Sequence, residues 1–210
     1  IFLMKYTFLL LAVIILAFGM VNCENDKAPK TLYEKLERDA LKSGERNDSL
    51  FLGLHFGMKK QDFYIHCAAL NKDTILYQGM GGKVEYHIKN ELKHSTRMTF
   101  YPEFNADEIW EIPVVFTYDG WAPWNRDYTA TKLRGRVKIM MENWYGGEKF
   151  VEIPHPTDTI ALVKIDGNRR ILLERDDVGT NVKATFTDLT VEKKLKEEFK
   201  KRQEEKAEEK

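Results

Sequence analysis

The stretch IALVKIDGNRRILLE, residues 160–174, predicts a β-hairpin. Two apolar runs, 160–165 and 170–174, flank an Asp166-Gly167-Asn168 turn, and an Asp-Gly pair between apolar runs is a strong signal for a tight hairpin turn. The same two-residue period occurs in 84–88, where Val, Tyr and Ile alternate with Glu and His. Alternation of this kind places one face of a strand against a core and the other in water. The sequence therefore predicts an antiparallel sheet.

Further elements extend outward from this hairpin. Helical spacing and end signals predict helices over 31–44, 59–71 and 128–145, the last with Leu133, Val137, Met140, Met141 and Trp144 on one stripe. Runs of adjacent strands indicate an α+β fold in which helices pack on one face of an antiparallel sheet, with two helix-plus-strands halves. We expect one domain over 31–189, followed by a charged helix over 190–210 with a frayed end. The remaining predicted strands are 75–78, 97–104, 109–118, 150–153 and 181–187.

Two predicted strands carry special features. Residues 50–56, LFLGLHF, form an apolar run that predicts a strand leading into helix 59–71. Pro113 lies inside strand 109–118, and because proline cannot donate to a strand ladder, we expect this strand at a sheet edge or a bulge.

A strand that runs into Gly57-Met58 and then a helix, over residues 52–63, resembles the small lipoproteins that serve outer-membrane assembly and the related beta-lactamase-inhibitor-like domains. The resemblance implies a fold and a cell-envelope setting. It implies no activity.

The first 22 residues are predicted to be a signal peptide. Lys5 precedes a long apolar run over 6–21, and a basic residue before an apolar core is typical of secretory signals. The run is shorter than the ~20 residues that a membrane-spanning helix needs. An uncleaved membrane anchor is the alternative, in which residues 1–3 join the run.

Cys23 directly follows the apolar run and precedes polar residues, which resembles the lipid-modified cysteine of a Gram-negative bacterial lipoprotein. The resemblance implies that Cys23 is the lipidation site, that 23–30 is a tether, and that the chain is held at a membrane of the cell envelope, the outer membrane being favoured. Cleavage after Gly19 is the alternative and would leave a soluble periplasmic protein. With Cys23 acylated, Cys67 is the only thiol left, so no intramolecular disulfide can form.

Charge and motifs exclude several functions. The 33 basic and 33 acidic residues give a net charge of zero, which argues against a nucleic-acid partner. The three serines lack a nucleophile-elbow setting, and no phosphate-binding loop is present. The five histidines are scattered, so we expect no metal and no cofactor. Cys67 lies on the apolar stripe of its helix, where it acts as a small buried hydrophobe.

Two groups of residues are candidate sites. The tryptophans all lie between 110 and 144, and four large rings surround one loop, namely Tyr118, Trp121, Trp124 and Tyr128. Such rings can bind a partner or can fold back as core. The second group supplies the acid and base of a possible hydrolase, namely Glu103, Glu108, Asp119 and Asp127; these carboxylates can equally be solvated surface.

The leading hypothesis is an exported, lipid-anchored envelope protein without catalysis, an interaction or assembly module that contacts an envelope protein or glycan through the loop over 121–128 and an open sheet face. The first alternative is an exported carboxylate-dependent hydrolase that acts on carbohydrate or peptide. The second is a soluble periplasmic ligand-binding protein. An enzyme should bury two of the candidate carboxylates beside the tryptophans in a cleft, whereas a binding module should expose the rings.

Overall fold

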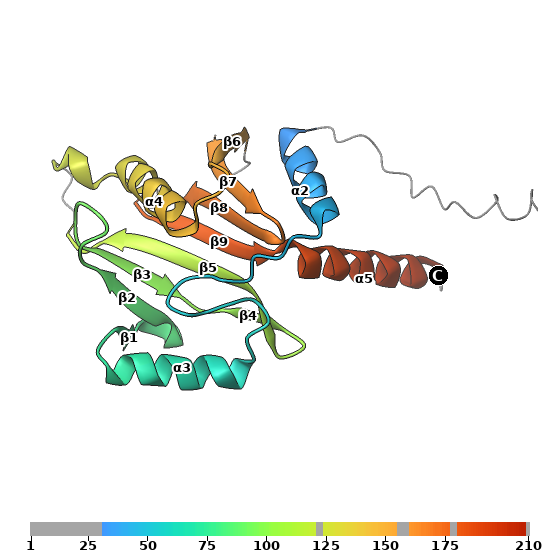
Figure 1. Ribbon diagram of the computed structural model, residues 1–210, viewed down its shortest axis with the longest axis horizontal. Helices are drawn as coiled ribbons and strands as arrows, with labels where there is room; N and C mark the ends of the chain where they lie inside the picture. The colour runs from blue at the N-terminus through green and yellow to red at the C-terminus, as the bar shows by residue number, and fades with distance from the viewer. Residues whose placement is uncertain (1–30, 121–123, 155–159, 177–179, 209–210) are drawn as a thin grey trace, which may run out of the picture. The chain divides into compact units, whose positions relative to one another are not determined.

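A computed structural model describes residues 31–120, 124–154, 160–176 and 180–208 (Figure 1). The predicted signal peptide, the tether with Cys23, and Trp121 lie outside the described residues. None of the described helices is long and apolar enough to cross a membrane.

The described strands form one antiparallel sheet of nine strands. Along the main path the order is β1-β2-β3-β5-β9-β8-β7-β6, and β4 pairs with β5 beside β3. The predicted α+β class with an antiparallel sheet is therefore confirmed. The strands are β1 (Leu76–Gln78), β2 (Val84–Ile88), β3 (Thr96–Phe100), β4 (Glu103–Asn105), β5 (Glu108–Tyr118), β6 (Val151–Pro154), β7 (Ile160–Asp166), β8 (Arg169–Arg175) and β9 (Val182–Asp188).

The hairpin predicted at 160–174 is β7 and β8, which pair from Asp166↔Arg169 to Leu162↔Leu173. Gly167 in its turn has φ 55°, and a Cβ added there would lie 2.4 Å from the carbonyl oxygen of Glu45. Both the left-handed backbone and this close approach require glycine. The turn is thus the point where the segment after the first helix docks, because Asn168 also donates its backbone N–H to Glu45 O.

β5 lies inside the sheet, between β3 and β9, so the expected edge position is wrong, whereas the alternative of an irregular pairing has support in a register shift between β4 and β5 opposite Ile109–Glu111. Pro113 pairs with Thr185 of β9 on one side. On the other side the partners change, since Val114 pairs with β3 and Glu111 pairs with β4. A residue without an N–H is tolerated there because the ladder is already interrupted.

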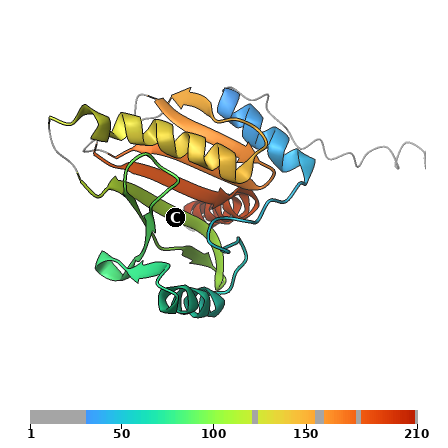
Figure 2. The same cartoon turned by 60° about the vertical axis from the view of Figure 1, so that its left-hand side comes forward.

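Four α-helices are present in the described residues: α2 (Leu32–Ser43), α3 (Lys60–Lys72), α4 (Ala130–Tyr145) and α5 (Leu189–Glu208). α4 packs over β8 and β9 and buries Leu133, Val137, Met140 and Met141. These side chains meet the core-facing residues of β3, β5 and β9, such as Met98, Phe116 and Phe186. Figure 2 shows α4 in front of the strands β7 to β9.

Residues 50–56 do not form the predicted strand. Leu52 and Gly53 have φ of 54° and 78°, which turns the chain back on itself. The apolar side chains of this compact turn plug the core beside α4, and Phe51 packs edge-on against Phe100 and Phe186 at 5.0 and 5.3 Å. A compact buried turn and a buried strand both give a continuous apolar run in the sequence, so the run alone does not distinguish them.

The helices are divided between the two faces of the sheet, which differs from the predicted packing on one face. Tyr33 of α2 packs against the face opposite α4, on a small cluster formed by Ile153, Ala161 and Val163. The capping box of Thr31 and Glu34 starts α2, and Gly44 in the left-handed conformation ends it. β7 carries apolar side chains on both faces, Leu162 on one and Ala161 and Val163 on the other, so each face needs a cover.

α5 docks through its first turns and is exposed beyond them. Leu189 is buried, Val191 and Leu195 are half-buried, and Phe199 is 61% exposed. Arg170 of β8 holds the first turn by donating to both carboxylate oxygens of Glu192, at 3.0 and 3.1 Å. The exposed part carries i,i+4 ion pairs, which support a helix that has few tertiary contacts.

A buried lysine ties the end of α4 to the β7–β8 hairpin. The Lys164 side chain is fully buried. Its ammonium donates to the carbonyl oxygens of Gly146 and Glu148 at 2.7 and 2.5 Å and to Asp166 Oδ1 at 2.8 Å. Asp166 also forms an ion pair with Arg169, whose Nη2 lies 3.2 Å from Asp166 Oδ2. A buried charge is tolerated in this place because every proton of the ammonium has an acceptor.

Candidate functional site

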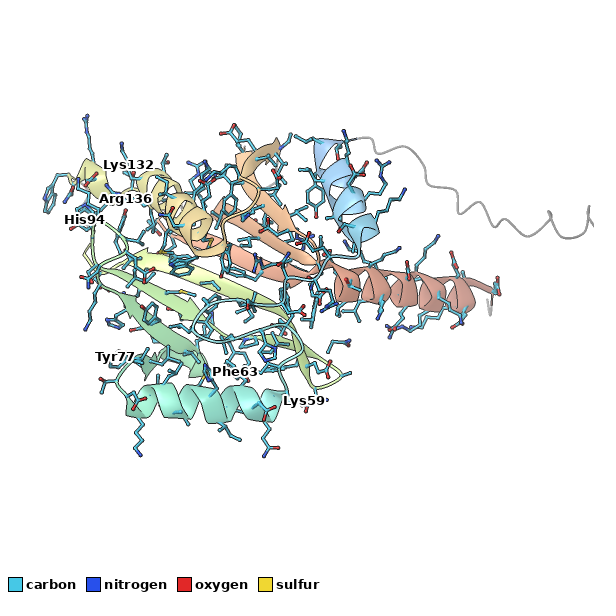
Figure 3. All side chains as sticks on the ribbon, in the orientation of Figure 1. Lys59, Phe63, Tyr77, His94, Lys132 and Arg136 are labelled. Atoms are coloured by element: carbon cyan, nitrogen blue, oxygen red, sulfur yellow. The ribbon has the colours of Figure 1, made fainter. Side chains whose placement is uncertain are left out.

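The candidate site lies where β5 ends and α4 begins. β3 and β5 are antiparallel, so Thr96 at the start of β3 pairs with Tyr118 at the end of β5. This register brings residues 93–95 beside the loop that leads to the short 3-10 helix η2 (Arg126–Tyr128). Figure 3 shows His94, which precedes β3, and Lys132 and Arg136 of α4 gathered at this end of the sheet.

Asp127 is the centre of an ionic cluster, which we call the Asp127 cluster: Lys93, His94, Asp127 and Arg136. His94 Nε2 lies 2.5 Å and Lys93 Nζ lies 2.9 Å from Asp127 Oδ2. Arg136 donates to Asp127 Oδ1 at 2.7 Å and to its backbone oxygen at 3.0 Å. These hydrogen bonds, that from His94 first and then those from Lys93 and Arg136, hold the pKa of Asp127 well below its usual range. Asp127 is therefore a permanent carboxylate at neutral pH.

Two tyrosines form the base of the loop. The His94 ring stacks on Tyr128 with 4.4 Å between centroids, and Tyr118 meets Tyr128 edge-on at 5.0 Å. Arg136 donates to the Tyr118 hydroxyl at 2.5 Å. Tyr118 is only 5% exposed and Tyr128 is half-buried. Both rings are thus part of the packed structure and not of an exposed surface.

Trp124 differs from these two tyrosines. Its side chain is 84% exposed, although it lies only three residues before Asp127. The structure therefore divides the predicted aromatic surface into a packed base, Tyr118 and Tyr128, and a projecting ring, Trp124; Trp121 lies outside the described residues.

Asp119 lies beside the Asp127 cluster and has its own partners. Its Oδ2 accepts from the hydroxyl of Ser95, and its Oδ1 lies 2.8 Å from Nε of Arg97. Ser95 is therefore committed to a carboxylate rather than to a histidine that could activate it. This geometry lacks the nucleophile–base contact that covalent catalysis needs.

The four candidate catalytic carboxylates do not meet. Glu103 and Glu108 belong to the β4–β5 hairpin, and Glu108 pairs with Lys59 at 3.1 Å. Asp119 and Asp127 lie beyond the opposite end of β5, which is eleven residues long and so spans about 30 Å. An acid and base for glycoside cleavage must be ~5–10 Å apart. Asp119 and Asp127 flank the same loop and each is paired with a cation, and the hydrogen bonds to Asp127 lower its pKa, which disfavours that residue as a general acid.

A metal site is not apparent at this position. Over the described ranges, no three His, Cys, Asp or Glu side chains gather closely enough to hold a metal ion. The histidine of the cluster has a carboxylate on one side and a tyrosine ring on its face, which is a structural arrangement.

His94 and Arg136 are the residues of this site that the sequence does not reveal. His94 is one of five scattered histidines, and Arg136 is one of several basic residues on the polar side of a helix. Both become recognisable only once the register of β3 with β5 is known. The dipeptide Lys93-His94 directly before a strand was the available signal.

No protein-family model, curated protein or solved structure matches this chain.

Proposed function

We propose that the chain is a non-catalytic interaction module of the cell envelope, attached to a membrane by a lipid on Cys23, that contacts a partner protein through the loop around Trp124. One observation carries the proposal: a tryptophan that is 84% exposed stands on a base fixed by the Asp127 cluster.

The fixed base favours binding over incidental exposure. Burying a tryptophan removes about 150–250 Å² from water, which corresponds to ~4–6 kcal/mol at about 25 cal/mol per Å². Asp127, three residues after Trp124, is held by Lys93, His94 and Arg136, so less entropy is lost there when the ring enters a partner's pocket and more of this free energy contributes to affinity. Tryptophan is also the residue type most enriched among binding hot spots.

The surroundings of Trp124 indicate the chemistry of the partner. Three exposed cations lie near Asp127: Lys93, which pairs with it, Arg126, its neighbour in η2, and Lys132 in the first turn of α4. Asp127 and Asp119, in contrast, are both paired with cations. The rim is therefore basic, and it fits a protein surface with an apolar pocket bordered by carboxylates. Such a rim accelerates association and makes it sensitive to salt.

The hydrolase alternative has less support. A general acid must be protonated near the working pH, yet Asp127 is held as a carboxylate, and Glu103 and Glu108 lie at the other end of β5.

The test compares Trp124→Ala with Phe199→Ala, a matched change of an exposed ring on α5. Both variants should melt within about 1 °C of the parent, since neither ring is core. A photo-crosslinker placed next to Trp124 should capture a partner from membranes that Trp124→Ala loses and Phe199→Ala retains. A melting temperature that falls by several degrees in Trp124→Ala contradicts the proposal. Equal capture of the partner by both variants also contradicts the proposal. If the parent chain binds protein-free vesicles and Trp124→Ala does not, the ring binds lipid instead.

The anchor is tested separately by mass spectrometry of the mature N-terminus. A diacyl or triacyl mass on Cys23 is expected. A mature chain that begins at Met20 contradicts lipidation and leaves the role of Trp124 untouched.

A further inference from the structure

A second concave site lies at the other end of α4. It is an open cleft with a volume of about 320 Å³, bordered by the turn at Leu50–Leu52, by β2 and β3, and by the last residues of α4. Tyr86, Trp144 and Tyr145 line it with aromatic rings, and Glu91 is its only charged lining residue. We call it the Glu91 cleft. Its size and its mostly apolar wall with few polar groups are those of small-ligand sites.

Glu91 is held in place by neutral donors. Trp144 Nε1 donates to Glu91 Oε2 at 2.5 Å. The Tyr86 hydroxyl is also hydrogen-bonded to this carboxylate, which contributes with burial to raising the pKa of Tyr86. These contacts come from α4 and β2, so the carboxylate is fixed by two elements that are far apart in the sequence.

The charge of Glu91 is not matched within the described part of the chain. No described Lys, Arg or His forms an ion pair with it; the nearby Lys93 pairs with Asp127 instead. By contrast, Arg169, whose guanidinium lies 4.2 Å over the Tyr145 ring, is compensated by Asp166. The cleft therefore presents a solvent-exposed negative charge, without an ion-pair partner among the described residues, beside aromatic rings.

Tyr145 lines the cleft with its ring. Its hydroxyl is buried and has no hydrogen-bond partner among the described residues. Because this oxygen is shielded from solvent, a ligand in the cleft meets the ring of Tyr145 and not its hydroxyl.

We propose that the Glu91 cleft binds a small organic ammonium ion. A carboxylate satisfies the charge of the ammonium, and the faces of Tyr86 and Trp144 attract its alkyl groups by cation–π interaction. A lone carboxylate beside apolar rings is a poor site for Ca²⁺ or Mg²⁺, which favour several oxygen ligands. Glu91 repels anions. Glu91 is two residues before Lys93 of the Asp127 cluster, but Trp124 does not line the cleft, so separate variants test the two proposals.

The test uses the full chain and two probes of equal shape, choline and its neutral isostere 3,3-dimethylbutan-1-ol. The indole N–H signal of Trp144, assigned with Trp144→Phe, is followed by NMR during titration. Choline should shift this signal saturably, and the neutral alcohol should bind at least about tenfold more weakly because it lacks the charge. Equal affinity for both probes, or no saturable shift with choline, overturns the proposal.

Charge variants complete the test. Glu91→Gln keeps an oxygen that can accept from Trp144 Nε1 but removes the charge, so choline affinity should fall about tenfold while the melting temperature is unchanged. Glu205→Gln on exposed α5 makes the same change of charge elsewhere and should leave the affinity as it is. Unchanged affinity in Glu91→Gln rejects the site. Trp124→Ala should bind choline with the affinity of the parent chain. Failure of the choline test and failure of the proposed partner surface can therefore be told apart.

Discussion

Removing the carboxylate of Asp166 should be among the most destabilising single changes in this protein. In Asp166→Ala the buried ammonium of Lys164 keeps the carbonyls of Gly146 and Glu148 but loses its counter-charge. Breaking a buried ion pair from one side typically costs ~3–5 kcal/mol, because a charge is left unpaired away from water. Arg169 loses the same partner. We therefore expect a loss in the upper half of that range.

The opposite change should be milder. In Lys164→Met the two carbonyls lose a donor, but Asp166 keeps Arg169 at 3.2 Å and is not left as an isolated charge. A loss of about 1–3 kcal/mol follows from the unsatisfied acceptors. We therefore expect Asp166→Ala to lower the free energy of unfolding more than Lys164→Met does. This order follows because the two carbonyls, which are neutral, cannot balance the charge of the buried ammonium.

Urea unfolding of the purified chain, followed by circular dichroism, measures both free energies of unfolding. Lys149→Met is the matched control, since Lys149 is 74% exposed and its ion pair with Glu142 spans 3.5 Å; it should change stability by less than ~0.5 kcal/mol. For a chain of this size each kcal/mol lowers the melting temperature by about 2–4 °C. An Asp166→Ala loss no larger than that of the control, or a larger loss in Lys164→Met, would refute the reasoning.

Two further predictions concern Cys67 and Arg170. Burial raises the pKa of Cys67 to about 11, so the rate of its alkylation by iodoacetamide in the folded chain should still rise about tenfold per pH unit at pH 10. Peptide mapping separates the product from that of Cys23, and a rate that levels off near pH 9 would contradict the burial argument. Arg170→Met removes both hydrogen bonds to Glu192, so the amides in the first turn of α5 should exchange with deuterium at least about tenfold faster, while exchange in α3 is unchanged. If Arg170→Lys keeps full protection, the charge alone suffices and the bidentate contact does not matter.

Local patterns in the sequence predict much of this fold. The alternation in β2 and β9, the Asp-Gly turn between β7 and β8 and the stripe on α4 each have a period that belongs to one kind of element. Thr31 and Gly44 predict the ends of α2 because their capping roles are local. In each case the deciding interactions lie within a few residues of one another.

The features that escaped prediction depend on contacts between distant segments. The apolar run at 50–56 becomes a turn because α4 and β3 surround it, and α2 lies on the second face because β7 is apolar on both sides. Pro113 is tolerated inside the sheet only because the ladder on one side passes from β3 to β4 at that point. Likewise the Asp127 cluster needs the β3–β5 register, which no local pattern contains.

The two outermost strands of the sheet have a consequence for self-association. β1 has three residues and pairs only with β2; β6 has four, ends in Pro154 and pairs only with β7 among the described strands. Long, flat edges are templates on which a second chain can grow, and short edges or a proline limit that growth. If a lipid on Cys23 concentrates many copies on one membrane, such edges would keep neighbouring copies from fusing their sheets. Recognition by this protein should then pass through side chains rather than through an added strand.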